Sequence, residues 1–276
     1  MVDFKNSLKK ISFIYLVSVP VLVTALAFIV GHVNYFTYVP IWLVNAVLMG
    51  IAVQKLSKST DKISLKTSLF FIFPWMLYAI FGGMGPPPES AAEWALQATE
   101  QVFRYTFLII GGISMSIGIF RLNKMLAYTS GSRYAKWSSI LIRIALPLFI
   151  LNMAYWGYFL TNVFITYSMA GSPAKPSWMK SIDQVFTIIR MVEVALFYLA
   201  TACLSVALRL NNQLSKAGSL IYVVLACLGA LLNVLPSTIE GPLAIASYLS
   251  YIPAFTMLMP YLIAVNLLAK SEYKNK

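Results

Sequence analysis

Four charged side chains lie inside long apolar stretches: Arg104, Arg143, Arg190 and Glu193. If those stretches span a membrane, each charge costs roughly 2.5–3.5 kcal/mol on insertion scales and needs a reason. The planar fork of an arginine binds carboxylate or phosphate through parallel hydrogen bonds, so anion recognition is the first chemistry to consider. Glu193 is the deepest carboxylate, and it would be the proton carrier of a proton-coupled transporter.

We expect Arg104 and Arg190 to hold an anionic group in a pocket that faces outward between the fourth, fifth and sixth spans. Polar and aromatic side chains at the same depth, including Tyr158, would line it. The alternative is that the arginines form intrahelical ion pairs with Glu100 and Glu193, at spacings of four and three residues, with the aromatic residues forming an interfacial belt. The predicted site residues are Arg104, Tyr105, Asn152, Tyr155, Trp156, Arg190 and Glu193.

The same inventory excludes several familiar chemistries. The single histidine, His32, rules out bis-histidine haem ligation and zinc-protease motifs. No apolar stretch carries two aspartates or a lysine, and no glycine-rich phosphate loop is present. Cys203 and Cys227 both fall within apolar stretches, where they are expected to be small buried hydrophobic residues. We therefore predict no metal, no cofactor and no catalytic set.

The elements that position these side chains follow from composition. The chain has 276 residues, of which 59% are hydrophobic and 11% charged, whereas soluble domains are about 25% charged. A helical span needs roughly 20 apolar residues. The apolar stretches are continuous, unlike the alternating strands of a barrel, so we predict an all-α bundle in a single integral membrane domain over 1–276. The eight predicted spans are 12–31, 39–56, 67–84, 102–120, 138–163, 186–208, 217–236 and 243–268.

The distribution of basic residues predicts the orientation of the bundle. Of the 21 lysines and arginines, the two tails and alternate connections carry most, whereas the opposite connections carry only Lys175 and Lys180. By the positive-inside rule, both termini are cytoplasmic, in a cell or inner membrane. The net charge of +12 is therefore interpreted as topology and not as nucleic-acid binding. The basic residues assigned to the cytoplasmic side are Lys5, Lys9, Lys10, Lys55, Lys58, Lys62, Lys66, Arg121, Lys124, Arg133, Lys136, Arg209, Lys216, Lys270, Lys274 and Lys276.

The first span has a second interpretation as a cleavable signal peptide, because two lysines precede the apolar run and Ala25-Leu26-Ala27 resembles a cleavage site. Apolar residues continue through Val30, which makes the run long enough to span, so we expect it to be retained. Cleavage would leave seven helices and an external N-terminus.

Similar residues recur at corresponding places in the chain. Glu100-Gln101-Val102-Phe103 opens the fourth span and Asp183-Gln184-Val185-Phe186 opens the sixth. Both of these spans end on an Arg-Leu-Asn sequence. One hypothesis is that the hairpins of spans 2–3, 4–5 and 6–7 descend from one duplicated unit; the alternative is coincidence in an apolar sequence.

Two features of the proline pattern bear on the pocket. Prolines inside spans are expected to kink the helices. The outer segment from Gly82 to Pro88 is expected to be non-helical and to precede a short helix capped by Ser90, with Trp94 as an interfacial anchor. Such segments are either lids over the pocket or ordinary interfacial loops. The span prolines are Pro20, Pro74, Pro147, Pro253 and Pro260.

These observations favour a small permease or binding-pocket protein for an anionic or amphipathic small molecule. The alternatives are a non-catalytic subunit or sensor of a membrane complex and, third, an intramembrane lipid-modifying enzyme. The expected partners are the lipid bilayer, a small anionic ligand or lipid headgroup, and a membrane-protein partner or second copy of the chain.

Overall fold

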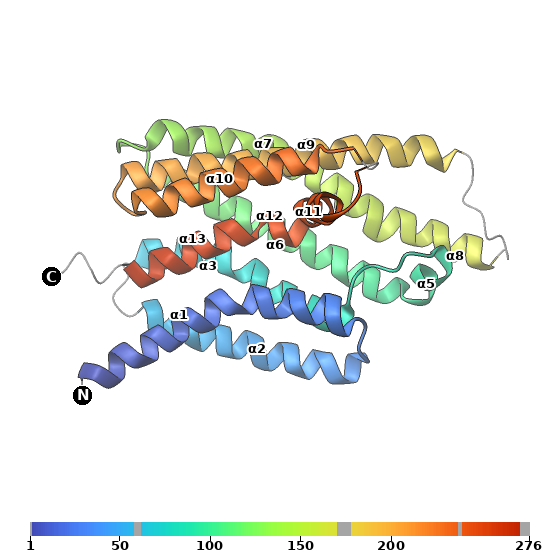
Figure 1. The fold of residues 1–276 in the computed structure, drawn as a ribbon, viewed down its shortest axis with the longest axis horizontal. Coiled ribbons are helices and arrows are strands. Elements are labelled where there is room, and N and C mark those ends of the chain that lie inside the picture. The colour runs from blue at the N-terminus through green and yellow to red at the C-terminus, as the bar shows by residue number, and fades with distance from the viewer. Residues whose placement is uncertain (1, 58–61, 170–177, 237–238, 271–276) are drawn as a thin grey trace.

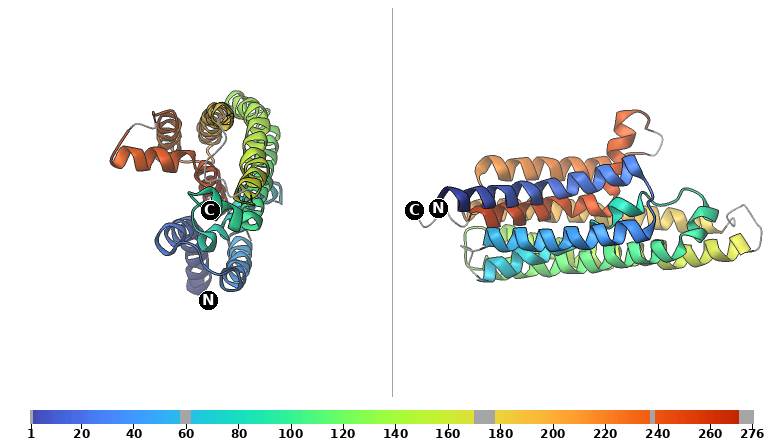
Figure 2. Two further views of the ribbon diagram at one scale, coloured as in Figure 1. Left: turned by 90° about the vertical axis from the view of Figure 1, so that its right-hand side faces the viewer. Right: turned by 90° about the horizontal axis from the view of Figure 1, so that it is seen from below.

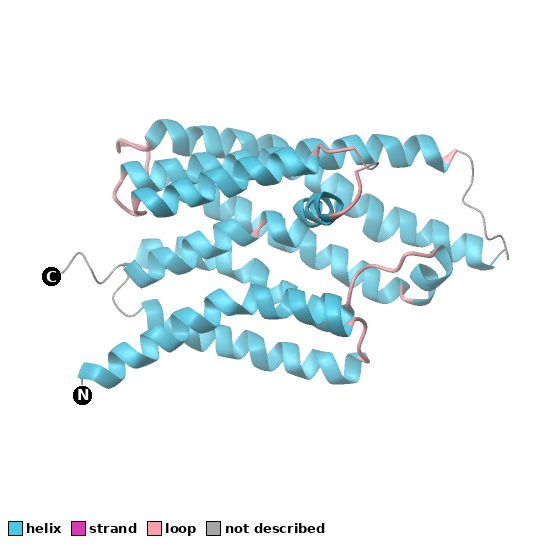
Figure 3. Cartoon of the chain, in the orientation of Figure 1, coloured by secondary structure: helices cyan, strands magenta, loops and turns pink. Residues whose placement is uncertain are grey.

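The protein is a bundle of long helices, described by a computed structural model for residues 2–57, 62–169, 178–236 and 239–270. Within these ranges every regular element is helical (Figure 3). The long helices run along one common axis, and the start of α1 and the end of α13 lie at the same end of the bundle (Figure 1). The elements are α1 (Val2–Ala25), the π-helical η1 (Leu26–Val30), α2 (Tyr35–Leu56), α3 (Lys62–Tyr78), α4 (Phe81–Met84), α5 (Ala91–Leu96), α6 (Ala98–Met125), α7 (Ser132–Ala154), the π-helical η3 (Tyr155–Leu160), α8 (Thr161–Met169), α9 (Met179–Leu210), α10 (Lys216–Asn233), α11 (Pro242–Tyr251), α12 (Pro253–Thr256) and α13 (Leu258–Lys270).

Eight helical segments in the described part of the chain are long and apolar enough to cross a membrane. This confirms the all-helical class and the predicted number of spans. Seven of the segments coincide with predicted spans apart from their ends. The segments are Ser7–Val30, Tyr35–Leu56, Ser64–Met84, Ala98–Met125, Ser132–Tyr167, Met179–Leu210, Lys216–Asn233 and Pro253–Lys270.

The eighth predicted span, 243–268, is wrong at its start. Pro253 has no backbone N–H and disfavours a helical conformation at the residue before it. Ile252 is accordingly extended, with φ −66° and ψ 122°, and the chain changes direction there. The preceding helix α11 is turned away from the common axis (Figure 2), and the apolar span begins only at Pro253.

The inner packing of the bundle depends on α6 and α9. Helix α7 packs along both of them, α3 packs along α6, and α13 packs along α3. Large aromatic rings lie against glycines in these contacts: a methyl group added to Gly111 would lie 2.0 Å from the hydroxyl of Tyr78, and one added to Gly112 would lie 2.5 Å from the ring of Phe149. The glycines therefore allow α3 and α7 to approach α6 closely.

Helix direction places the basic residues together. Lys55 and Lys124 lie in the last turns of α2 and α6, Arg209 lies in the last turn of α9, and Lys136 lies in the first turns of α7. All of these helix ends are at the end of the bundle that carries the start of α1 (Figure 1). The side of the membrane that this end faces stays a prediction.

The proposed hairpin repeat also stays a prediction. Helices α6 and α7 pack along each other, as do α9 and α10. Helices α2 and α3 touch only briefly, and α2 packs mainly on α1. The first of the three hairpins is therefore packed differently from the other two.

Candidate functional site

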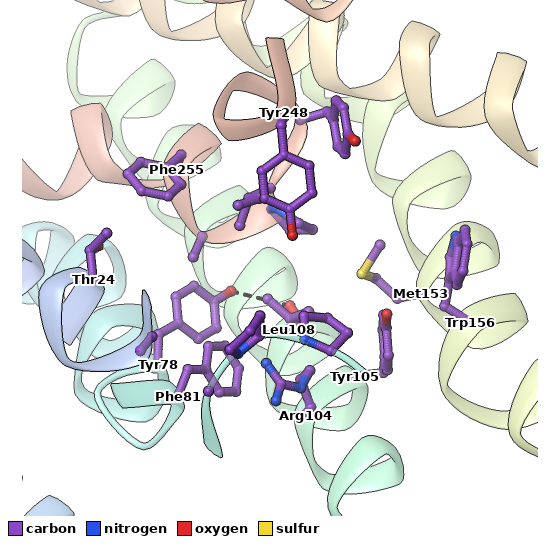
Figure 4. A pocket seen from close by; sticks show the side chains of 18 of the residues that line it. Thr24, Tyr78, Phe81, Arg104, Tyr105, Leu108, Met153, Trp156, Tyr248 and Phe255 are labelled. Atoms are coloured by element: carbon purple, nitrogen blue, oxygen red, sulfur yellow. Dashed lines mark hydrogen bonds between the residues drawn. The ribbon is translucent and has the colours of Figure 1, made fainter. Parts of the chain in front are cut away.

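A cavity of about 360 Å³ is lined by residues from the end of α1, the start of α6 and the end of α7. These parts of the helices lie away from the basic helix ends (Figure 1). Side chains from several distant parts of the chain surround the cavity, with Arg104 and Tyr105 on one side and Tyr248 on the other (Figure 4). Its walls are formed by the end of α1 and η1, by α3 and α4, by α6, by the α7–η3 junction, by α9, and by α11 and α12. The loop Gly85–Pro88 and Trp94 complete the lining.

Arg104 reaches this cavity from α6. Its side chain is 6% exposed, and its Nη2 donates a hydrogen bond to the carbonyl oxygen of Met84 at 3.2 Å. The guanidinium carbon lies 5.4 Å from the centre of the Phe81 ring. Its Nε is buried and has no hydrogen-bond partner. The arginine is thus held in place by a carbonyl and an aromatic ring, neither of which neutralises its charge.

Arg190 reaches the same cavity from α9. Its guanidinium carbon lies 3.8 Å from the centre of the Tyr251 ring, in a close cation–π contact. Its Nε is likewise buried without a hydrogen-bond partner. Tyr251 belongs to α11, the helix that is turned away from the bundle axis. Arg190 therefore contacts a segment that was predicted to be part of the eighth span.

The ion pairs of the alternative interpretation are absent: among the described residues, no ion pair joins Arg104 to Glu100 or Arg190 to Glu193. Glu100 is engaged by residues from other elements. Nε2 of His32 lies 2.9 Å from its Oε2, and the hydroxyl of Tyr38 donates to its Oε1 at 3.3 Å. Helical spacing makes an ion pair possible but does not ensure that it forms, because residues from other elements compete for the same carboxylate.

Glu193 lies immediately behind the cavity wall and is fully buried. Nδ2 of Asn152 donates to its Oε1 at 2.8 Å, while its Oε2 has no hydrogen-bond partner. Asn152 lines the cavity, is 1% exposed, and has an unpartnered Oδ1. The amide therefore connects the carboxyl group to the cavity by one hydrogen bond.

The charged side chains in the cavity lining are both basic. The cavity is lined by two arginines, and none of the described residues in its lining is aspartate or glutamate. Most of the other lining side chains are aromatic or apolar, and Nε1 of Trp75 is a further buried donor without a partner. Buried polar groups normally have partners, and in the described part of the chain the unpartnered atoms near this cavity include donors and also an acceptor, Oδ1 of Asn152.

The structure brings five of the seven predicted residues to this cavity: Arg104, Tyr105, Asn152, Trp156 and Arg190. Glu193 is separated from it by Asn152, as described above, and Tyr155 lies outside its lining.

Tyr155 points elsewhere because neighbouring residues of a helix project in different directions. Its hydroxyl donates to Oδ1 of Asp183, and its ring stacks on Phe186 at 3.7 Å between centres. Tyr158 also lies outside the lining: it is 40% exposed, and its hydroxyl is 2.7 Å from that of Thr106.

Trp94 was predicted to be an interfacial anchor, and that prediction is wrong. It is 4% exposed, lines the cavity, and donates from Nε1 to Oγ1 of Thr161 at 2.8 Å. The short helix that contains Trp94 was predicted correctly: α5 begins after Ser90, whose Oγ accepts a hydrogen bond from the backbone N–H of Glu93 at 3.2 Å. The outer segment from Gly82 to Pro88 was expected to be non-helical, but helix α4 extends to Met84, and only Gly85–Pro88 is a loop, which lies in the cavity wall.

Sequence reasoning missed the aromatic part of the site. Trp75, Tyr78 and Phe81 come from the third span, and Tyr248 and Tyr251 come from α11. Their types are common in any membrane protein, so no sequence signal separates them from lipid-facing or core aromatic residues. Only the packing of α3, α4 and α11 around α6 identifies them.

Comparisons with family models, with curated proteins and with solved structures found no match for this chain.

Proposed function

We propose that the protein is a small permease or binding-pocket protein for an anionic, amphipathic small molecule. The observation that carries this proposal is one cavity that, among the described residues, is lined by two arginines and by no acidic side chain. A carboxylate or phosphate would accept hydrogen bonds from the two guanidinium groups and offset their charge in a region of low dielectric. The aromatic and apolar remainder of the lining suits the body of an amphipathic molecule.

The membrane orientation is part of the same proposal. The basic helix ends lie together, and the positive-inside rule places them in the cytoplasm of a cell or inner membrane. The cavity occupies the opposite half of the bundle and would therefore accept its ligand from the outer side.

Binding is tested with a matched pair of small aromatic probes, 4-nitrobenzoate and neutral 4-nitrobenzamide. Three of the six tryptophans line the cavity, so a nitroaromatic probe in it quenches intrinsic fluorescence. We expect saturable quenching by the acid in purified protein in lipid nanodiscs, and much weaker binding of the amide. Equal affinities for the two probes would contradict an anion site.

The arginine variants make the test specific to the cavity. A charge-assisted hydrogen bond contributes about 1.5–3 kcal/mol, so Arg104→Gln or Arg190→Gln should weaken 4-nitrobenzoate binding about 10- to 150-fold. The matched control is Arg143→Gln: Arg143 is also inside a span, but it is exposed, lies 5.7 Å from the Phe120 ring, and is outside the cavity lining. An equal loss of affinity in all three variants would show that the effect is not local.

Glu193 distinguishes transport from binding alone. If the protein is a proton-coupled permease, Glu193 is the proposed proton carrier, since Asn152 connects it to the cavity. Uptake of 4-nitrobenzoate into proteoliposomes should then depend on an imposed proton gradient, and Glu193→Gln should abolish that dependence while probe binding persists. Unchanged uptake in Glu193→Gln removes this role, and binding without any uptake favours the sensor or subunit alternative.

A further inference from the structure

Two aromatic side chains form one part of the cavity lining. Phe28 of η1 and Tyr248 of α11 both line the cavity. Their rings meet edge to face, with centres 6.4 Å apart. Both side chains are nonetheless exposed on the outside of the bundle, Phe28 by 46% and Tyr248 by 38%. These two rings therefore lie at the rim of the cavity.

The outer surface around these rings is apolar. On η1, Leu26 is 47% and Ile29 is 83% exposed, and on α11, Leu243 is 56% and Ile245 is 64% exposed. Exposed side chains of this kind on a membrane-spanning bundle contact lipid chains. In a membrane, the two rings would therefore be in contact with lipid chains.

The loop that lines the cavity near its outer end is fixed in place. Backbone N–H of Val33 donates to the carbonyl oxygen of Gly83 at 2.8 Å, which ties α4 to the turn after η1. Gly85, with φ +65°, packs so closely on Gly31 that an added methyl group would lie 2.9 Å from its carbonyl carbon. This contact leaves no room for a side chain, so the Gly85–Pro88 segment is a firmer wall than the two rings.

Helix α11 is joined to the rest of the chain by non-helical residues at both ends. It is bounded by Gly241, at φ +71°, and by the extended Ile252 before Pro253. Within the bundle it packs mainly on α10 and only lightly on α9, where the hydroxyl of Tyr198 donates to the carbonyl oxygen of Ser250 at 2.8 Å. A rotation at the two bounding residues would separate Tyr248 from Phe28, and it would also break the contacts that Ser250 and Tyr251 make with α9.

Resting on the proposed anion site, we propose that its ligand is a single-chain membrane amphiphile with a carboxylate head, which enters from the bilayer between η1 and α11. The head lies between Arg104 and Arg190, and the chain leaves between Phe28 and Tyr248 into the lipid. A cavity of about 360 Å³ is near the lower end of small-molecule sites, about 300–1,000 Å³, and so holds a head and the first part of a chain.

The test uses a photoactivatable stearate with a mid-chain diazirine, its methyl ester as the neutral control, and the full-length protein in vesicles. After illumination, peptide mapping should find stearate adducts in the peptides that contain η1 and α11. Arg104→Gln and Arg190→Gln should lower this labelling about tenfold or more, whereas Arg143→Gln should leave it unchanged. Arg104→Lys, which keeps a charge, should retain part of the labelling and shows that loss in the glutamine variant is not unfolding.

The entry route is tested by a covalent tether. In a Cys203→Ser, Cys227→Ser background, Phe28→Cys and Tyr248→Cys are joined by a short bismethanethiosulfonate reagent before stearate is added. The tether should reduce labelling about tenfold or more, and reduction of the tether should restore it. The two single-cysteine variants treated with the same reagent are the controls.

The outcomes separate this inference from the proposed function. Stearate adducts that are indifferent to the tether or to the arginine variants overturn the lateral entry of an amphiphile. If 4-nitrobenzoate binding to the untethered protein still depends on Arg104 and Arg190, the proposed anion site is supported even though lateral entry is not. If neither ligand depends on the arginines, both proposals fail.

Discussion

Gly157 lies where η3 approaches α6, the contact that brings Trp156 and Tyr105 to the same cavity. A methyl group on Gly157 would lie 2.3 Å from Cβ and 2.9 Å from Cγ of Tyr105. Carbon atoms pack at about 3.5–4.0 Å, so the two helices must separate by about 1.2 Å or more. Neither contacted atom is at the flexible end of a side chain, and the backbone must therefore move.

We predict that Gly157→Ala destabilises the protein by about 1–2 kcal/mol. Overpacking of this kind costs about 1–3 kcal/mol. Alanine recovers roughly 0.5–1 kcal/mol, because glycine loses more conformational freedom in a helix. The overpacking cost is the larger of the two. The displacement of Tyr105 should also weaken 4-nitrobenzoate binding.

The matched control is Gly50→Ala in α2, where no atom lies within 4 Å of the added methyl group. This variant should be neutral or slightly more stable, by at most about 1 kcal/mol. The free energy of unfolding is measured for both variants by titration with sodium dodecyl sulfate in mixed micelles, followed by circular dichroism. If Gly157→Ala is as stable as Gly50→Ala, the close contact between η3 and α6 is not as described.

Three further substitutions test single hydrogen bonds by the same unfolding assay. Trp94→Phe removes the donor to Thr161 and should cost about 0.5–1.5 kcal/mol and weaken probe binding; a neutral result would show that α5 is not held at the cavity by this bond. Ser90→Ala removes the N-terminal cap of α5 and should lower the free energy of unfolding by about 0.5–2 kcal/mol. An unchanged stability would show that Ser90 does not cap this helix. Tyr261→Phe removes the 2.6 Å hydrogen bond to the carbonyl oxygen of Leu16 and should cost about 0.5–1.5 kcal/mol; no loss would mean that α13 is not fastened to α1 there.

The membrane-spanning architecture was predictable because it depends on local composition. A bilayer demands roughly 20 apolar residues per helix whatever the neighbouring helices do, so eight spans can be counted along the chain. The one misplaced boundary, at Pro253, arose because apolar residues continue across a backbone break. Hydropathy is averaged over many residues and does not detect such a break, whereas the missing N–H of proline interrupts the helix at a single residue.

The candidate site was predictable only in part. Arg104 and Arg190 were identifiable because a charge in an apolar stretch is costly wherever it points. The partners of a charge depend on elements far away in the sequence: Glu100 is engaged by His32 and Tyr38, and Arg190 by Tyr251. Helical spacing identified ion pairs that were possible within one helix. In the folded protein, Glu100 and Arg190 instead contact residues of other elements.

The sequence by itself determined which segments are apolar enough to span and which positions carry charges that need a partner. The tertiary structure alone decided which of these charges share a cavity. Tyr155 and Trp156 are neighbours in the chain, yet one turns toward Asp183 and the other toward the cavity. The physical reason is that span formation depends on transfer to lipid, a property of one segment, whereas a binding site depends on contacts among segments.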